Sequence, residues 1–284
     1  IMSRGLGDVY KRQGEAGGMK DFHNKVAVIT GAGGGVGSAL AQQLAARGCH
    51  LALVDISEPA LVKVADDLAG RNIKISRHVV DITSKAQMAA LPTAVLAVHG
   101  KVNLLVNNAG ITYQKSFATH TLEDWEKIVG INWWGVLYGC HYFLDALSTA
   151  GDAHIVNLSS MSAFAGLPGQ TSYCATKGAV KLLGEAMWAE MEKLNIGVTS
   201  VHPGAIKTDM IQATLSTSDD LEAAQRNYEL AHRIGVSPEH VAATIIKAVE
   251  KNKMRIRVGK DAWMLDVLKR LFPVGLQKML RRVA

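Results

Sequence analysis

The chain of 284 residues is 48% hydrophobic, which is ample for the buried core of one domain. Its formal net charge of +6 is concentrated after residue 250, where ten lysines and arginines face two aspartates, and the preceding part is close to neutral. The sequence pI of about 9.2 therefore does not indicate a nucleic-acid partner, because such a basic surface would accompany a recognisable binding motif and the sequence has none.

The three cysteines, Cys49, Cys140 and Cys174, are an odd number without a C-x-x-C pair, and each lies in an apolar stretch. We therefore expect buried free thiols, which suit a reducing cytoplasm. No stretch approaches the ~18 uninterrupted apolar residues of a membrane span, and no secretory signal is recognised. The sequence predicts a soluble, cytoplasmic protein without a metal site.

Residues 1–18 have no apolar period, contain scattered glycines and do not begin with methionine. We expect a disordered or non-native prefix there, with a natural start at Met19. The remaining chain is predicted to form one domain over residues 19–259, followed by an extension at residues 260–284.

The first recognisable unit is a strand, a glycine turn and a helix. The β-branched run Val26–Thr30 precedes the turn at residues 31–37, and a helical pattern follows at residues 38–47. Glycines let a backbone approach a pyrophosphate, and a helix N-terminus offers it free N–H groups. A flexible surface loop is the alternative, but the position between strand and helix favours a nucleotide site. The predicted cofactor contacts here are Gly31, Gly33, Gly34, Gly35, Val36 and Gly37.

The second strand, at residues 50–54, ends at Asp55. A carboxylate at this strand end can accept hydrogen bonds from both hydroxyls of an adenosine ribose, and it repels the 2′-phosphate of NADP. The glycine turn supplies no compensating cation, so NAD is favoured over NADP, with Asp55 and Ile56 at the ribose. The open alternative is that Asp55 caps the helix that begins near Ser57.

Strands and helices then alternate, with helices at residues 59–69 and 85–98 and strands at residues 73–80 and 102–106. This alternation predicts an α/β fold, a doubly wound parallel sheet with helices on both faces and ligands at the carboxyl ends of its strands. Residues that follow two strands are candidate cofactor contacts, with an aspartate at the adenine edge, although capping and turn formation would also explain them. They are Asp81, Ile82, Asn108, Ala109 and Gly110.

A long helical pattern at residues 122–147 is interrupted near Gly130, where Asn132 is a polar residue in an apolar run. Such a side chain either bonds a neighbouring carbonyl and bends the helix or holds a buried water.

Ser160 follows an apolar run at residues 154–159, and Tyr173 and Lys177 lie in a predicted helix at residues 172–194. Four residues apart, they stand one turn apart on the same helix face. The ammonium is expected to lower the phenol pKa from ~10, so that the phenol exchanges protons with an alcohol or ketone. Ser160 is expected to hold the same substrate oxygen. An exposed lysine beside an amphipathic tyrosine is the alternative.

A sixth strand at residues 197–202 leads into a turn that is predicted to bond the nicotinamide carboxamide. His202 is expected to be a packed strand residue, because no nucleophile or metal partner lies at a suggestive spacing. The predicted contacts in the turn are Pro203, Gly204, Ile206 and Thr208.

The order of these motifs resembles that of the short-chain dehydrogenase/reductase family, from Met19 to about Gly259. The matching residues are Thr30-Gly31-x-x-x-Gly35-x-Gly37, Asn107-Asn108-Ala109-Gly110, the set Asn132, Ser160, Tyr173 and Lys177, and Pro203-Gly204. The resemblance implies a single-domain Rossmann fold with a seven-stranded sheet and an NAD(P)-dependent oxidoreductase that acts on CH–OH groups. We expect a homodimer or homotetramer.

The family's roles, carried over residue by residue, make Tyr173 the general acid/base and Ser160 the residue that holds the substrate oxygen. Lys177 lowers the tyrosine pKa and bonds the nicotinamide ribose. Asn132 keeps a water that links Lys177 to solvent, and this role rests on the resemblance alone.

The segment at residues 208–233 is expected to form a lid over the substrate. The candidate pocket residues are Met161, Phe164, Leu167, Tyr113 and Met210. They suggest an apolar alcohol or ketone of lipid, steroid or retinoid character, although the same residues would equally pack the core.

A helix is expected to open at Ser237-Pro238-Glu239, and a seventh strand at residues 254–258. Beyond it, apolar residues recur every three or four positions among lysines and arginines, and Pro273 divides the pattern. We expect basic amphipathic helices that pack on the body or on another subunit, with contact to an anionic inner-membrane surface as the alternative.

Three other functions remain open. One is an NADPH-dependent carbonyl or 3-ketoacyl reductase, and Asp55 is the residue that argues against it and for an NAD-dependent enzyme. A non-catalytic nucleotide-sensing regulator is disfavoured by the intact Ser160, Tyr173 and Lys177. A membrane-associated scaffold would act through the extension.

Overall fold

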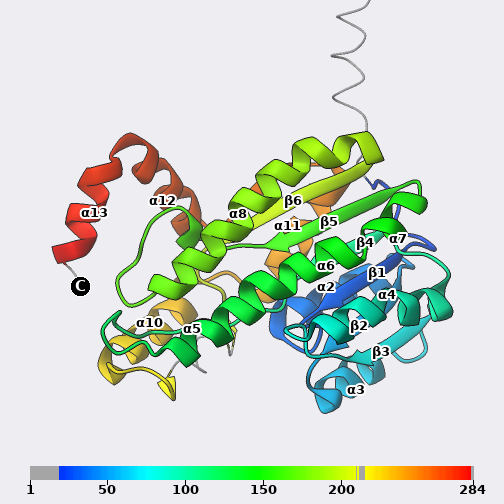
Figure 1. The fold of residues 1–284 in the computed structure, drawn as a ribbon, viewed down its shortest axis with the longest axis horizontal. Helices are drawn as coiled ribbons and strands as arrows, with labels where there is room; N and C mark the ends of the chain where they lie inside the picture. Colours follow the sequence, from blue (N-terminus) through cyan, green and yellow to red (C-terminus); the bar gives the residue numbers. More distant parts are fainter. Residues whose placement is uncertain (1–18, 209, 211–214, 283–284) are drawn as a thin grey trace, which may run out of the picture.

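The computed structural model describes residues 19–208, 210 and 215–282. The predicted prefix at residues 1–18 lies outside this range, as do residues 209 and 211–214 of the predicted lid. The described chain forms three layers, with helices on both faces of one sheet (Figure 1).

Seven parallel strands form the sheet in the order β3-β2-β1-β4-β5-β6-β7, which confirms the predicted doubly wound architecture. Because helices cover both faces, β1, β5 and β6 are buried along their whole length and do not alternate between apolar and polar residues. The strands are β1 (Val26–Thr30), β2 (His50–Asp55), β3 (Ile75–Val79), β4 (Leu104–Asn107), β5 (Ala153–Leu158), β6 (Ile196–Pro203) and β7 (Arg255–Val258).

Two apolar clusters, one on each face, make up the core. The first joins the sheet to α2, α3 and α11, and the second joins it to α4, α6 and α8. The bounds of these helices are α2 (Gly35–Ala45), α3 (Glu58–Asp67), α4 (Lys85–His99), α6 (Gly135–Tyr142), α8 (Thr171–Met191) and α11 (Pro238–Glu250). A helix α10 (Leu221–Ile234) follows β6 and precedes α11.

The predicted long helix at residues 122–147 is divided, as its sequence indicated. It consists of α5 (Leu122–Val129), a π-helical turn (Gly130–Trp134), α6 and α7 (Leu144–Thr149). A π-helical turn interrupts the regular i→i−4 hydrogen bonding and commonly marks a functional site. Here it contains Asn132.

Serine hydroxyls fix two of the predicted helix starts. Ser57 Oγ accepts a hydrogen bond from Ala60 N at 3.4 Å before α3, and Ser237 Oγ accepts one from His240 N at 3.2 Å before α11. Both are ordinary N-caps. The predicted opening at Ser237-Pro238 is confirmed.

The extension consists of α12 (Lys260–Leu271) and α13 (Pro273–Arg282), which divide at the predicted proline. Figure 1 shows α13 at the outer edge of the molecule, with α12 between it and the sheet. Within the part of the chain that the structure describes, none of the helices combines the length and hydropathy needed to span a bilayer.

Candidate active site

Most of the predicted site residues follow the carboxyl ends of parallel strands and therefore lie along one edge of the sheet. Asn132, Tyr173 and Lys177 lie instead in helical segments. The connections from β1 and from β4 run to opposite sides, because β2 and β3 lie beyond β1 and β5 to β7 lie beyond β4. Such a topological switch point is where doubly wound sheets bind ligands. The glycine turn follows β1 at this point.

The glycine turn is too tight for side chains at Gly31, Gly33 and Gly37, and a methyl group on Gly33 would stand 2.5 Å from Ala60 Cβ. Gly31 has φ +64°, and a methyl group there would stand 2.9 Å from Ala109 Cα. A methyl group on Gly37 would collide with the Gly31 carbonyl oxygen. Gly34 precedes α2 at its cap position and has no side chain to bind the first N–H groups. The turn therefore presents bare backbone and a helix N-terminus, which suit a phosphate.

Asp55 lies against the same turn. Its Oδ2 accepts a hydrogen bond from Gly33 N at 3.0 Å, and its Oδ1 accepts one from Ser57 N at 3.0 Å. The cap of α3 is Ser57 itself, so the alternative role of Asp55 as that cap is wrong. Each oxygen of the Asp55 carboxylate can still accept a hydrogen bond from another donor. The next residue, Ile56, is 69% exposed.

Thr30 and Asn108 brace the turn against β4. Asn108 Nδ2 donates to the carbonyls of Thr30 and Gly31, both at 3.0 Å. Thr30 Oγ1 accepts from Asn108 N at 3.1 Å and Ala109 N at 3.2 Å. Thr30 was not predicted as a site residue, although it opens the glycine motif.

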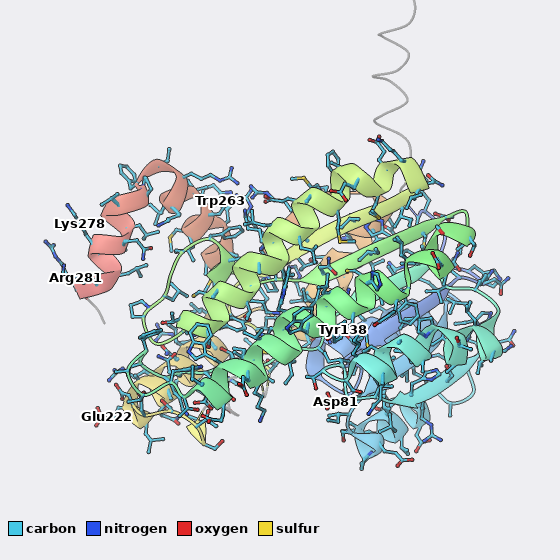
Figure 2. The ribbon with its side chains drawn as sticks, viewed as in Figure 1. Asp81, Tyr138, Glu222, Trp263, Lys278 and Arg281 are labelled. Atoms are coloured by element: carbon cyan, nitrogen blue, oxygen red, sulfur yellow. The ribbon has the colours of Figure 1, made fainter. Side chains whose placement is uncertain are left out.

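Asp81 and Ile82 serve local structure. Asp81 Oδ1 accepts hydrogen bonds from Thr83 N at 2.9 Å and from the Thr83 hydroxyl at 2.7 Å. Asp81 thus stabilises a local turn, which was the alternative to a cofactor contact. Ile82 is 9% exposed and packs so closely on α6 that a methyl group on Gly135 would collide with it. Figure 2 shows Asp81 near the lower edge of the sheet.

Ser160 and Tyr173 meet at the end of β5. Burial raises the pKa of Tyr173 above its ordinary value of 10.0, and a hydrogen bond with the Ser160 side chain acts in the opposite direction. Ser160 Oγ also accepts from Ser162 N at 3.1 Å, which fixes its rotamer. A neutral phenol therefore stands beside an oriented hydroxyl.

Lys177 lies one turn from Tyr173 in α8, as predicted, but the expected lowering of the tyrosine pKa is wrong for this structure. Lys177 Nζ donates to the Leu158 carbonyl at 2.7 Å and lies 5.8 Å from the centre of the tyrosine ring. Burial lowers the pKa of Lys177 itself to about 8, so Lys177 loses its proton at a lower pH than an exposed lysine does. For the Tyr173 phenol, desolvation is the largest influence on the pKa.

Asn132 is fully buried and bonded on both sides of its amide. Its Oδ1 accepts from Ile111 N and its Nδ2 donates to Ile111 O, both at 2.9 Å, and Nδ2 also approaches Thr176 Oγ1 at 3.3 Å. A methyl group on Gly110 would stand 3.3 Å from both Asn132 Oδ1 and Lys177 Nζ. The π-helical turn and α8 thus bring Asn132 and Lys177 to the same face of Gly110.

The turn after β6 lies over the glycine turn. Gly204 N donates to Val258 O at 2.8 Å, and Ile206 forms a bridge with Val236. A methyl group on Gly35 would stand 3.0 Å from Thr208 Cγ2. The segment from Pro203 to Thr208 therefore reaches the start of α2.

His202 is buried and packed, as expected. Its ring lies 4.7 Å from that of Phe164, and burial lowers its pKa to about 4. One face of the Phe164 ring therefore packs on His202. Tyr113, another predicted pocket residue, is only 6% exposed, whereas Met210 is 39% exposed.

Two of the three cysteines, Cys49 and Cys140, are buried as predicted. Cys174 is only half-buried, and its sulfur accepts a hydrogen bond from Leu167 N.

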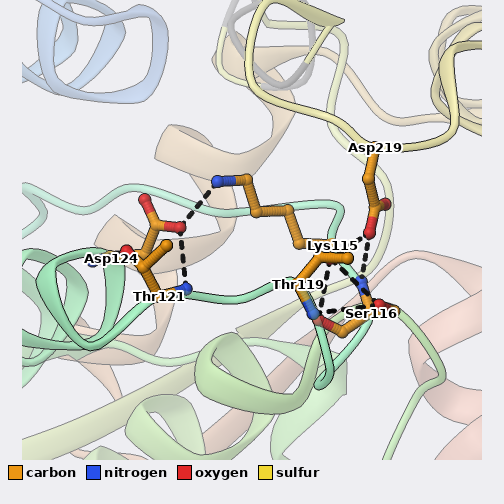
Figure 3. A network of polar contacts seen from close by, with 6 residues as sticks. All are labelled: Lys115, Ser116, Thr119, Thr121, Asp124 and Asp219. Atoms are coloured by element: carbon orange, nitrogen blue, oxygen red, sulfur yellow. Dashed lines mark hydrogen bonds and ion pairs between the residues drawn. The ribbon is translucent and has the colours of Figure 1, made fainter.

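The segment between β4 and α5 borders the site and is held from two sides (Figure 3). Lys115 N donates to Gly169 O at 2.9 Å, and Lys115 Nζ binds Asp124 at 2.6 Å. On the other side, Asp219 accepts from Ser116 N at 3.1 Å and from the Thr119 hydroxyl. This segment connects the loop before α8 to the chain that precedes α10.

The glycine turn at the switch point, together with Ser160, Tyr173 and Lys177 at the same edge, defines a nucleotide-dependent oxidoreductase. The model of the short chain dehydrogenase family matches residues 25–219, more than half of the chain. The protein belongs to the short-chain dehydrogenase/reductase family.

Several known proteins are similar over nearly the whole chain. SadH of Mycobacterium tuberculosis, named as an oxidoreductase, is 36% identical over 265 residues, which cover 92% of this chain and 95% of SadH. The cyclohexanol dehydrogenase of Acinetobacter sp. is 32% identical over 79% of this chain and 87% of its own. A short-chain dehydrogenase/reductase from Burkholderia phymatum, solved in complex with NAD, superimposes with a TM-score of 0.82 at 30% identity, covering 91% of this chain and 97% of its own.

Proposed function

We propose that the protein transfers a hydride between NAD and a secondary alcohol or ketone, with Tyr173 as general acid/base. The observation that carries this proposal is the closeness of the Ser160 hydroxyl to the Tyr173 phenol, near enough to influence its pKa, at the sheet edge that holds the glycine turn. Two hydroxyls so placed can share one substrate oxygen.

The residues of the site fit a dinucleotide. The glycine turn would hold the pyrophosphate, because the close contacts at Gly31 and Gly37 keep the turn tight and it leads directly into the N-terminus of α2. Asp55 would bind the adenosine ribose, and Lys177 the nicotinamide ribose. When bound, NAD accepts the hydride and NADH returns it. The other proposed contacts are Gly33, Gly34, Gly35, Val36, Ile56, Asp81, Ile82, Asn108, Ala109, Gly110, Pro203, Gly204, Ile206 and Thr208.

In carbonyl reduction, the neutral Tyr173 phenol gives its proton to the substrate oxygen while Ser160 donates a hydrogen bond to the same oxygen. Alcohol oxidation is the reverse, and there Tyr173 must first lose its own proton so that its phenolate can take the proton of the substrate hydroxyl. A phenolate is stabilised when Lys177 is charged, and one N–H of Lys177 is already held by Leu158 O. Two N–H groups remain for the ribose and for the water that the family places beside Asn132.

NAD is proposed over NADP because the Asp55 carboxylate is fixed at the glycine turn by Gly33 and Ser57. Titration with NADH and NADPH, followed by nicotinamide fluorescence, tests this. We expect at least tenfold tighter NADH binding, and loss of that preference in Asp55→Asn, which keeps the shape but not the charge. Tighter NADPH binding to the wild type would make a carbonyl or 3-ketoacyl reductase the better reading. Binding of neither would favour a regulator or scaffold.

An apolar, lipid-, steroid- or retinoid-like alcohol or ketone is the proposed substrate class. It is supported by the half-buried Met161 and Leu167 beside Ser160 and by the similarity to a cyclohexanol dehydrogenase. Steady-state rates with a series from cyclohexanol to a steroid alcohol test it. We expect kcat/KM to rise with apolar size. A decline along the series would contradict it.

We also propose a homodimer or homotetramer. Exposed aromatic residues support it, since Trp134 and Trp188 are 44% and 42% exposed on neighbouring elements, and Trp134 stacks 5.5 Å from Tyr138, which Figure 2 shows at the front of α6. Light scattering of the wild type and of Trp188→Glu is the test, and a dimer or tetramer that dissociates in the variant is expected.

Contact with an anionic membrane surface is proposed for the extension, in a cytoplasmic protein whose three thiols are unbonded. Trp263, Leu271 and Phe272 are more than half exposed, and Figure 2 shows Lys278 and Arg281 pointing away from the body. The two aspartates of α12 are already bonded, so the outward charge is positive. Removal of residues 261–284 should lower co-sedimentation with phosphatidylserine vesicles but not with phosphatidylcholine vesicles; unchanged sedimentation would contradict the contact.

A further inference from the structure

The extension reaches back to the turn after β6 through one side chain, Asp261 in the first turn of α12. Its Oδ2 accepts a hydrogen bond from Ala205 N at 2.7 Å, and its Oδ1 accepts one from Ala262 N at 2.9 Å. Ala205 directly follows Pro203-Gly204. A residue beyond the last strand therefore fixes the backbone of a predicted cofactor segment.

Two glycines make room for this carboxylate. A methyl group on Gly204 would collide with both Asp261 oxygens, and one on Gly259 would collide with Oδ1. Gly259 also has φ +104°, a backbone conformation that favours glycine. Residue 204 must therefore be a glycine for Asp261 to come this close, whatever a ligand requires at the same position.

The bond to Ala205 adds a side-chain contact to the backbone bonds that hold the segment, in which Ala205 O accepts from Val236 N at 2.9 Å and Lys207 N donates to Val236 O at 3.0 Å. Three residues further on, Thr208 lies against Gly35 at the start of α2, and Ile206 pairs with Val236. Ala205 N is the only backbone donor of residues 204–206 for which the structure gives a side-chain acceptor. Loss of that acceptor leaves a part-buried N–H unpaired and removes the one side-chain bond that orients the peptide at Ala205.

We infer that Asp261 is a positioning residue for the nicotinamide half of the cofactor site. It acts through the backbone of Ala205 and does not touch the cofactor. The inference rests on the proposed binding of NAD, and it makes the extension part of the cofactor site.

A separate anchor keeps α12 in place when Asp261 is changed. Asp266 is 3% exposed and binds Arg255 at 3.3 Å, Arg257 at 3.0 Å and Arg270 at 2.9 Å. None of these contacts involves residues 203–208. A substitution at Asp261 therefore tests the turn, and one at Asp266 tests the attachment of the helix.

The test compares the binding of NADH with that of ADP-ribose, which lacks the nicotinamide. For Asp261→Ala we expect NADH to bind about tenfold more weakly, as for the loss of a hydrogen bond to a charged group, and ADP-ribose to bind as in the wild type. Asp261→Asn keeps an acceptor for Ala205 N and should restore most of the affinity for NADH.

Gly204→Ala supplies an independent variant, because its methyl group must displace the carboxylate. It should weaken NADH binding as Asp261→Ala does, and the double variant should be no weaker than either single variant, since both remove one interaction. Equal loss of NADH and ADP-ribose affinity, or no loss, would overturn the inference. Failure of the wild type to bind either ligand would instead overturn the proposed function, and the inference with it.

Discussion

The catalytic helix α8 and the extension α12–α13 differ in how their positions are determined. In α8, Lys177 Nζ donates to Leu158 O at 2.7 Å, and Lys177 O accepts from Ser159 Oγ at 2.8 Å. The extension is attached mainly through Asp266, with one bond from Gln277 Nε2 to Gly166 O at 3.0 Å, and it exposes several large apolar side chains. The catalytic residues therefore lie on a helix that many contacts hold in position. The extension is held by a few contacts, and single substitutions can remove them.

The largest expected effect is that of Tyr173→Phe, which removes only the hydroxyl. We expect kcat to fall about a thousandfold, the usual size of a general acid/base contribution, with an unchanged Kd for NADH. Stopped-flow rates and fluorescence titration measure the two quantities. A turnover close to that of the wild type would remove Tyr173 from the mechanism.

Lys177 makes the stability of the α8 region depend on pH. Because burial lowers its pKa from 10.5 to about 8, the unfolded chain binds more protons between those values, and stability rises as the pH increases through this window and is lost as it falls toward 8. From pH 7 to pH 10 the free energy of unfolding of the wild type should gain about 2 kcal/mol relative to Lys177→Met. Urea unfolding of both proteins at each pH is the measurement, and parallel curves would contradict the lowered pKa.

Asp266→Ala should release the extension without disturbing α8. The substitution leaves three arginines that are partly open to solvent, so we expect a loss of about 2 kcal/mol, below the roughly 3–5 kcal/mol found when the remaining charge is buried. Hydrogen exchange should accelerate in α12 and α13 but not in α8. Arg226→Ala, which removes an exposed ion pair with Glu222, is the matched control and should change neither.

The smallest effect is expected for Leu271→Ser in the extension, because that side chain is 66% exposed. The free energy of unfolding should change by less than about 0.5 kcal/mol. Co-sedimentation with anionic vesicles should nevertheless decrease. A loss of stability comparable to that of a core substitution would show that Leu271 is covered in solution.

The fold could be predicted from the sequence because its signals are local. The buried runs at Val26–Thr30 and the following glycines define a strand, a turn and a helix within about twenty residues. Repetition of this pattern leaves few topologies for a parallel sheet. Tyr173 and Lys177 share a helix face for the same local reason. Their roles, like those of the other site residues, remain predictions until the variants are measured.

Other properties depend on which distant segments meet. The pKa of Tyr173 rises because of burial, which the spacing to Lys177 does not reveal. Asn132 bonds Ile111, twenty-one residues away, and not a neighbouring carbonyl of its own helix. Asp261 bonds Ala205 across fifty-six residues, and no periodic pattern marks that pair. Phe164 resembled a pocket residue in the sequence but stacks on His202.

The position of Asp261 also has a consequence for biosynthesis. The chain leaves the ribosome from its N-terminus, and domains generally fold as units in that direction. The glycine turn and α8 emerge well before residue 261, so a nascent chain that ends at residue 219, where the family match ends, lacks both β7 and the acceptor for Ala205 N. The hydrogen bond between Ala205 and Asp261 therefore forms only after the beginning of α12 has been released.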